Sequence, residues 1–160
     1  MSTSATSSTN RSTIEGSIDI AASPQEIWAI VSDLRRMGEW SPQCRRMYVR
    51  GGSVGRGTRT LNVNRQGWKV WPTRSKVTVF EPERELAITV AENKTVWTYR
   101  LEPTETGTRL TESRTTPHGV SAVSNLLTRY VLGGTAQFED ELERGIGQTL
   151  QRIKAEAERG

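Results

Sequence analysis

Cysteine, histidine and long apolar runs are scarce in this chain of 160 residues, and each scarcity excludes a kind of site or segment. Cys44 is the only cysteine, so no internal disulfide and no cysteine-based metal cluster can form. His118 is the only histidine, and with no second histidine or carboxylate motif beside it we expect no metal site and no cofactor. No segment approaches the roughly 18 apolar residues of a membrane-spanning helix. We therefore expect a soluble, cytoplasmic protein without stable membrane insertion.

Acidic residues are absent between Glu39 and Glu81, although the net charge of the whole chain is only +4. The basic residues of this stretch are Arg45, Arg46, Arg50, Arg56, Arg59, Arg65, Lys69, Arg74 and Lys76. We favour the interpretation that they cover the solvated outer faces of three strands. Trp68 and Trp71 lie among them, so peripheral contact of region 45–76 with an anionic membrane stays open as an alternative. No module that reads nucleic acid is present, so we expect no nucleic-acid partner.

The first thirteen residues contain few apolar side chains and consist mainly of Ser, Thr, Ala and Asn. Such a composition cannot form a core, so we expect residues 1–13 to be a disordered tail. The remainder, 14–160, has the length that one core usually occupies, and we find no internal repeat in it. The sequence therefore predicts one domain after the tail.

Strand signals dominate the first two thirds of that domain. Ile14, Ile18 and Ile20 alternate with polar residues, which is typical of a half-buried strand. Apolar or β-branched runs separated by turn residues predict six more strands, at 46–50, 58–64, 68–80, 85–91, 95–101 and 108–116. The signal ends near His118, and residues 120–132 could then form a short helix or an ordered lid.

Helix signals frame the strands on both sides. Ser23-Pro24-Gln25-Glu26 combines an N-cap serine, a proline at the first helical position and a glutamate at the third, so a helix should begin there. Asp33 can cap a second short helix that ends at Gly38. One long helix is predicted near the C-terminus, with an apolar stripe made of Phe138, Leu142, Ile146, Leu150, Ile153 and Ala157.

The residues in these elements resemble a known superfamily. The opening signature is Ile18-Asp19-Ile20-Ala21-Ala22-Ser23-Pro24-Gln25-Glu26-Ile27-Trp28, then Asp33, then Trp40-Ser41-Pro42. It continues in Gly107-Thr108-Arg109-Leu110-Thr111-Glu112 and in Thr149-Leu150-Gln151-Arg152-Ile153-Lys154. Over about residues 14–157 the chain is similar to the polyketide cyclase/dehydrase branch of the START-like (SRPBCC) superfamily. This resemblance implies an α+β helix-grip fold. In that fold a curved antiparallel seven-stranded sheet wraps a long C-terminal helix, two short helices follow the first strand, and a ligand chamber lies between sheet and helix.

The alternation within each strand predicts which side chains line that chamber. Taking the apolar parity as inward gives a mainly aromatic and aliphatic wall of Leu61, Val63, Trp71, Val77, Val79, Leu86, Ile88, Val90, Trp97, Tyr99, Leu101 and Leu110. Glu112 and Arg114 share this parity. On the long helix, Gly145 and Gly147 each give up roughly 1 kcal/mol of helix propensity, which would leave room for a ligand. The resemblance adds Met37 and Trp40 at the chamber mouth. The candidate ligand-binding residues are Met37, Trp40, Leu61, Trp71, Val79, Ile88, Trp97, Tyr99, Glu112, Arg114, Phe138, Leu142, Gly145 and Ile146.

Recognisable catalytic motifs are missing, since the sequence has no nucleophile elbow, phosphate-binding loop or dinucleotide fingerprint. Glu112, Arg114 and His118 are the remaining candidates for an acid–base role. Glu112 and Arg114 could form an internal ion pair, orient a polar group of the ligand, or lie at a solvated rim, and we favour a structural or rim position. We expect His118 to be solvated, and Cys44 to be inert despite its basic neighbours.

Three functions stay open at this point. The favoured one is binding or carrying of a hydrophobic small molecule such as a lipid, isoprenoid, steroid or polyketide. The second is a cyclase or dehydratase in which Glu112, Arg114, Tyr99 and His118 move protons in one cavity. The third is a protein- or membrane-interaction module with a collapsed cavity. We expect a monomer or a homodimer whose partner is the hydrophobic small molecule.

Overall fold

The computed structural model describes residues 13–116 and 135–159 of the chain. After β1 (Thr13–Ile20) come three short helical segments, α1 (Pro24–Val31), the 3₁₀ turn η1 (Leu34–Arg36) and α2 (Met37–Trp40). The strands β2 (Cys44–Val49), β3 (Arg59–Gln66), β4 (Lys69–Glu81), β5 (Glu85–Val90), β6 (Val96–Thr104) and β7 (Gly107–Thr115) follow, and the last described element is α4 (Thr135–Arg159). Thr13 thus belongs to β1 and not to the tail, whereas the predictions for 1–12 and 120–132 lie outside the described residues.

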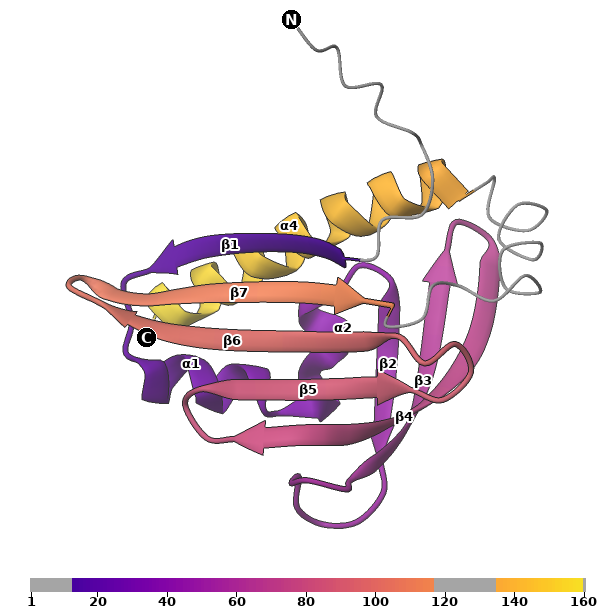
Figure 1. Cartoon of the computed structure of the whole chain (residues 1–160), viewed down its shortest axis with the longest axis horizontal. Coiled ribbons are helices and arrows are strands. Elements are labelled where there is room, and N and C mark those ends of the chain that lie inside the picture. Colours follow the sequence, from indigo (N-terminus) through magenta and orange to yellow (C-terminus); the bar gives the residue numbers. More distant parts are fainter. Residues whose placement is uncertain (1–12, 117–134, 160) are drawn as a thin grey trace, which may run out of the picture.

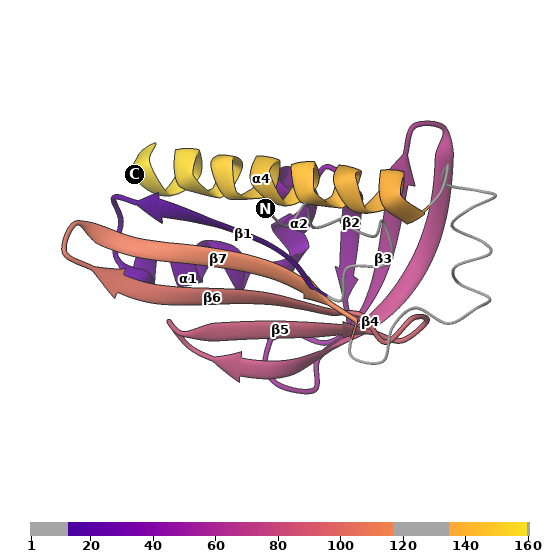
Figure 2. The same cartoon turned by 45° about the horizontal axis from the view of Figure 1, so that its top comes forward.

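The seven strands form one antiparallel sheet in the order β1-β7-β6-β5-β4-β3-β2. The first strand closes the sheet against the last, with Ile14 opposite Arg114 and Ile20 opposite Thr108. The sheet is curved, and α4 runs along its concave side next to β1 (Figures 1 and 2). This arrangement confirms the predicted helix-grip fold.

The helices after β1 follow their sequence signals at the start and depart from them at the end. The Ser23 hydroxyl accepts a hydrogen bond from the Glu26 backbone N–H at 3.2 Å, with Pro24 in the first turn, so α1 begins as predicted. The second helix was predicted to end at Gly38, but η1 and α2 carry the helical backbone through this glycine to Trp40. A side chain at Gly38 would overlap the Arg45 carbonyl oxygen, so this glycine lets α2 pack directly on β2.

The apolar stripe of α4 faces the sheet. Its members Leu142, Ile146, Leu150, Ile153 and Ala157 are all buried, as predicted, while the Phe138 side chain lies outside the described part of the structure. Gly16 in β1 brings the helix close, because a Cβ there would lie 3.0 Å from the Ile146 Cγ2 atom.

The side chains predicted to point inward do so in β5, β6 and β7, but the prediction is wrong for β3 and for part of β4. Leu61 is 46% exposed, and Val63 lies on the same outer face, so neither lines the interior. The residues that β3 turns inward are polar, which the assumption of an apolar inner face could not anticipate. In β4 a bulge between Val77 and Val79 reverses the alternation, so Phe80, not Val79, stands opposite Leu86.

Candidate functional site

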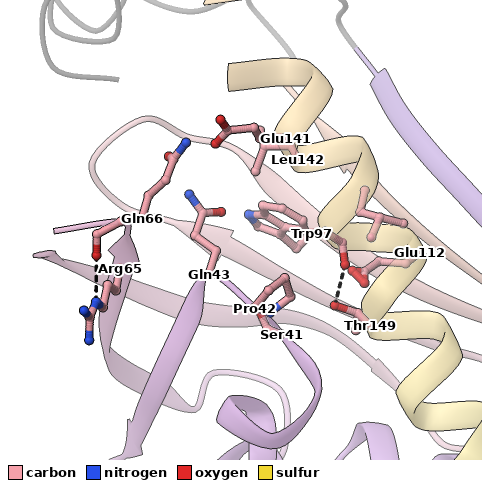
Figure 3. A pocket seen from close by; sticks show the side chains of 13 residues that line it. Ser41, Pro42, Gln43, Arg65, Gln66, Trp97, Glu112, Glu141, Leu142 and Thr149 are labelled. Atoms are coloured by element: carbon pink, nitrogen blue, oxygen red, sulfur yellow. Dashed lines mark hydrogen bonds between the residues drawn. The ribbon is translucent and has the colours of Figure 1, made fainter. Parts of the chain in front are cut away.

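A pocket of about 240 Å³ lies between α4, the loop after α2 and the hairpin that joins β3 to β4. We call it the outer pocket. Figure 3 shows Gln43 and Trp97 on its sheet side and Leu142 and Thr149 on α4. Its lining residues are Ser41, Pro42, Gln43, Arg65, Gln66, Gly67, Trp97, Glu112, Glu141, Leu142, Gly145, Ile146 and Thr149.

A second pocket of about 90 Å³ extends toward β3, β4 and β5, and we call it the inner pocket. Its lining residues are Met37, Ser41, Gln43, Cys44, Met47, Asn62, Asn64, Thr73, Ser75, Ile88, Val90, Trp97, Tyr99 and Glu112. Ser41, Gln43, Trp97 and Glu112 line both pockets, so the two are neighbouring parts of one site.

Glu112 on β7 lies where the two pockets meet, with only 2% of its surface exposed. Burial raises the pKa of its carboxyl to about 8, and a hydrogen bond with Tyr99 opposes this shift. At neutral pH the carboxyl is therefore mainly protonated and uncharged. Its Oε1 atom has no hydrogen-bond partner in the described part of the chain. A buried polar atom without a partner is costly, so this oxygen is the strongest sign of a ligand group in the site.

Tyr99 on β6 stands directly opposite Glu112 in the sheet register. Its hydroxyl donates to the Met37 sulfur at 3.7 Å. Burial raises the pKa of Tyr99 well above its ordinary value, and the neighbouring Glu112 carboxyl raises it further. Tyr99 therefore stays a neutral phenol, and the two side chains form an uncharged polar pair within the inner pocket.

Arg114 does not join this pair. It is 7% exposed and lines neither pocket. Burial lowers the pKa of its guanidinium, while the carboxylate of Glu139 on α4 raises it. Because Glu112 and Arg114 are both buried, neither lies at a solvated rim, which was one of the two positions that the sequence favoured for them. Arg114 interacts electrostatically with Glu139, across the interface between β7 and α4.

The inner faces of β3 and β4 carry a row of neutral polar side chains that sequence reasoning missed. Asn62 Nδ2 donates to Thr73 Oγ1 and to Ser75 Oγ, both at 3.2 Å, and Asn64 Nδ2 donates to the same threonine oxygen at 3.0 Å. Thr60 hydrogen-bonds to Asn62 at 2.8 Å and also to Ser75. The signal was present in the sequence, because all five residues are uncharged and share one strand parity while the arginines occupy the other.

This polar ladder, made of Thr60, Asn62, Asn64, Thr73 and Ser75, changes the character of the pocket wall. The wall was predicted to be mainly aromatic and aliphatic, but the β3–β4 side is polar and the apolar lining comes from β2, β5, β6, α2 and α4. Thr73 Oγ1 already accepts two hydrogen bonds, and among the described residues no acceptor is found for its own proton. The ladder can therefore donate a hydrogen bond into the inner pocket.

The other candidate residues divide into those that line the pockets and those that do not. Met37, Ile88, Trp97 and Tyr99 line the inner pocket, and Trp97, Leu142, Gly145 and Ile146 line the outer one. A Cβ at Gly145 would only touch Pro42, at 3.4 Å, whereas Gly147 is exposed on the outer side of α4 and leaves no room for a ligand. His118 lies outside the described residues.

Two tryptophans predicted to line the chamber do not do so. Trp40 is buried beneath α4, where the Arg36 guanidinium stacks 4.6 Å from its ring centre and Arg152 donates to its carbonyl oxygen at 3.2 Å. Trp71 shares the inward parity of Thr73 but lies beyond both pockets.

The described residues give no support for thiol chemistry or for a metal site. Burial raises the pKa of the Cys44 thiol to about 11, so its basic neighbours do not activate it. Within 13–116 and 135–159, no group of three His, Cys, Asp or Glu side chains is placed to hold a metal ion. In the same residues, no helix has both the length and the apolar character needed to cross a membrane.

Comparison with known proteins gives this site a family. The family described as polyketide cyclase / dehydrase and lipid transport matches residues 11–158. The chain belongs to this family. The polyketide-cyclase-like protein Cgl2372 from Corynebacterium glutamicum is 31% identical, with 91% of each chain covered and a TM-score of 0.60. No curated protein matches the chain.

Two solved structures of polyketide-pathway proteins share the fold of this family member. The di-domain ARO/CYC StfQ from the steffimycin biosynthetic pathway has a TM-score of 0.72 at 16% identity, with 92% of this chain covered. The di-domain ARO/CYC BexL from the BE-7585A biosynthetic pathway has a TM-score of 0.69 at 18% identity, with 91% covered. This chain spans about half of either protein, 51% of StfQ and 50% of BexL.

Proposed function

We propose that this protein binds a neutral, oxygenated hydrophobic molecule, of the size and polarity of a small polyketide, in the two joined pockets. The observation that carries the proposal is Glu112, a buried and mainly protonated carboxyl that lines both pockets and whose Oε1 atom has no hydrogen-bond partner among the described residues. The outer pocket alone, about 240 Å³, is just below the usual range of ligand sites, roughly 300–1,000 Å³. A small molecule that also enters the inner pocket fits this space.

The polar groups of the site favour an oxygenated ligand over a plain hydrocarbon. A hydrocarbon would leave Glu112 Oε1 and the buried Gln66 Oε1 without hydrogen bonds, at about 1–3 kcal/mol for each. A ligand hydroxyl can donate to either oxygen, and a ligand carbonyl can accept the proton of the neutral Glu112 carboxyl, so such groups remove that cost. The apolar side chains of Trp97, Leu142 and Ile146 then cover the body of the ligand. The family, which includes both cyclases and lipid transport proteins, agrees with such a ligand.

A matched pair of ligands tests the proposal. We expect 1,8-dihydroxyanthraquinone to bind at least tenfold more tightly than anthracene, measured by quenching of the protein's tryptophan fluorescence and by calorimetry. Glu112→Leu should abolish this preference and Glu112→Gln should keep part of it, because the amide still offers a hydrogen bond. Glu81→Gln, an exposed glutamate at the end of β4, is the control. Absence of binding and of any thermal shift with either ligand, in a protein that also carries no copurified molecule, would refute the proposal.

A second candidate function, catalysis of an intramolecular aldol cyclisation, is favoured by the pairing of Glu112 with Tyr99 in one pocket. Of the four residues that this hypothesis requires, these two meet in the inner pocket, Arg114 lies elsewhere and His118 is outside the described residues. In this reaction an enol carbon of a poly-β-ketone attacks a carbonyl carbon. The carbonyl oxygen takes the Glu112 proton, and the resulting carboxylate regains a proton from the attacking enol.

The Glu112→Gln variant distinguishes catalysis from simple binding. Catalysis predicts that this variant binds a poly-β-ketone substrate but no longer releases a cyclised product, and that wild-type turnover falls as the pH rises through about 8. Simple binding predicts no product from either protein, as followed by mass spectrometry.

A further inference from the structure

The outer face of β2, β3 and β4 is unusual because it exposes large apolar side chains. Tyr48 is 49% exposed, Leu61 46%, Val70 60% and Trp68 83%. These four are the exposed large hydrophobic residues of the described chain, and all lie in or between these strands. Trp68 stands in the turn between β3 and β4, where the Lys69 ammonium lies 5.7 Å from its ring centre.

Cations surround these apolar side chains on the same face. Arg59 lies directly opposite Lys76, and both are exposed. Like charges facing each other across two strands destabilise a sheet, so this pairing indicates that the face has a use besides folding. Arg65 lies opposite Val70, and Arg74 opposite Leu61. The stretch between Glu39 and Glu81 has no acid to neutralise them, and of these cations Arg74 alone has an ion pair in the described residues, with Glu92 at 3.0 Å.

We propose that this surface, the basic face, docks on an anionic lipid bilayer. It consists of Tyr48, Arg59, Leu61, Arg65, Trp68, Val70, Arg74 and Lys76. Each basic residue near an anionic membrane contributes about 1 kcal/mol of attraction, and tryptophan is enriched at the headgroup level of membranes. The geometry places Trp68 at the headgroups and the arginines and Lys76 against the lipid phosphates.

The arrangement of the basic face favours a bilayer over an acidic protein. Its apolar side chains lie among cations, with Tyr48 and Leu61 directly opposite each other. Apart from Arg65, which lines the outer pocket, none of its residues lines a pocket that could hold a partner's side chain. A fluid surface of negative charge needs no such pocket, because lipids rearrange around each cation.

Docking through the basic face brings the bilayer beside the outer pocket. The hairpin that carries Trp68 also contributes Arg65, Gln66 and Gly67 to the pocket lining, as Figure 3 shows for the first two. A hydrophobic molecule dissolved in the bilayer can then enter without crossing water. This last step rests on the proposed function, whereas the docking itself does not.

Co-sedimentation of the full chain with large vesicles tests the docking. We expect the wild-type protein to bind vesicles of phosphatidylcholine with 30% phosphatidylglycerol, to bind pure phosphatidylcholine at least tenfold more weakly, and to lose binding in high salt. Lys76→Glu should lower the partition coefficient about tenfold or more. Arg84→Glu is the matched control, because it changes the charge equally at an exposed position in the turn between β4 and β5, at the other end of β4 from Trp68 (Figure 1).

Trp68→Ala isolates the apolar part of the interaction. It should weaken vesicle binding about tenfold without changing the salt dependence, and Trp68→Phe should restore part of the loss. Circular dichroism spectra and melting curves confirm that each variant folds. Failure of the wild type to sediment with anionic vesicles overturns the proposal, as do equal losses for Lys76→Glu and Arg84→Glu. Capture of an acidic protein without vesicle binding also overturns it.

The same variants separate this proposal from the proposed function. Lys76 and Trp68 line neither pocket, so their substitutions should leave dihydroxyanthraquinone binding unchanged. Glu112→Leu should change that binding and leave vesicle binding intact. Loss of one activity without the other therefore shows which of the two proposals fails.

Discussion

The two halves of the sheet use their faces in opposite ways. In β5 and β6 the inner face is mainly apolar, with Leu86, Ile88 and Leu101 buried, and in β7 the buried Leu110 is followed on that face by Glu112 and Arg114. In β3 the inner face carries the polar ladder, whereas Leu61 points outward among arginines. One sheet thus contains a conventional core half and a half whose alternation is inverted. The inversion indicates that the second half is shaped by what it binds as well as by folding.

The largest difference between the halves should be seen in leucine truncations. Leu86→Ala removes a fully buried side chain and should lower the free energy of unfolding by about 3 kcal/mol. Leu61→Ala, the same change on the outer face, should cost less than about 0.5 kcal/mol. Urea denaturation measures both. Equal losses would show that Leu61 packs in solution and that the halves do not differ.

The next largest effect is a dependence of stability on pH, which arises from Glu112. Its pKa is about 8 in the folded protein and ordinary in the unfolded chain, so unfolding releases a proton between these values. The folded protein holds this proton more tightly, so the contribution of Glu112 to the free energy of unfolding is fully present below the pKa of the unfolded chain. This contribution is lost as the pH rises through about 8. The loss should approach about 1.4 kcal/mol per pH unit.

Glu112→Gln isolates this contribution, because the amide does not titrate. Denaturation of both proteins at pH 6, 7 and 8 should show the wild type losing stability relative to the variant by about 2 kcal/mol over the range. A constant difference between the two proteins would mean that Glu112 is solvated and has no raised pKa.

A smaller effect is expected from the polar ladder. Asn62→Ala leaves Thr60, Thr73 and Ser75 without their amide partner and should cost about 1–2 kcal/mol. Asn64→Ala lies nearer the strand end and should cost less. If dihydroxyanthraquinone protects wild type but not Asn62→Ala in thermal shifts, the ladder also contacts the ligand. A variant with wild-type stability would show that water replaces the amide.

Most of the fold could be predicted from the sequence because its signals are local. The Ser23-Pro24 start of α1, the alternation in β1 and the stripe of α4 each depend on residues close together in the chain. The inner face of β3 was missed because its apolar residues share the outward parity with the arginines, while Asn62 is satisfied inside the fold by hydrogen bonds to Thr73 and Ser75 on the next strand.

The candidate site was predicted less completely for the same reason. Glu112 was singled out because a charged residue shared the buried parity, and the structure places it between the two pockets. Its supposed partner Arg114 interacts with Glu139 instead, a contact set by the packing of α4 on β7. The bulge at Val77–Val79 likewise depends on pairing with β5. The prediction that Val79 points inward, which assumed regular alternation, was therefore wrong.

The smallest expected effect has an unusual sign, because Lys76→Glu should stabilise the protein. It replaces the like-charged pair of Lys76 and Arg59 by an opposite-charged one, which should raise the free energy of unfolding by about 0.2–1 kcal/mol. The gain should shrink in high salt, as expected for exposed charges. Arg84→Glu, with no cross-strand cation in its register, should not show it. A stabilising substitution that weakens vesicle binding would mean that the basic face is kept at the expense of stability. A destabilising one would mean that the two cations are already compensated within the fold.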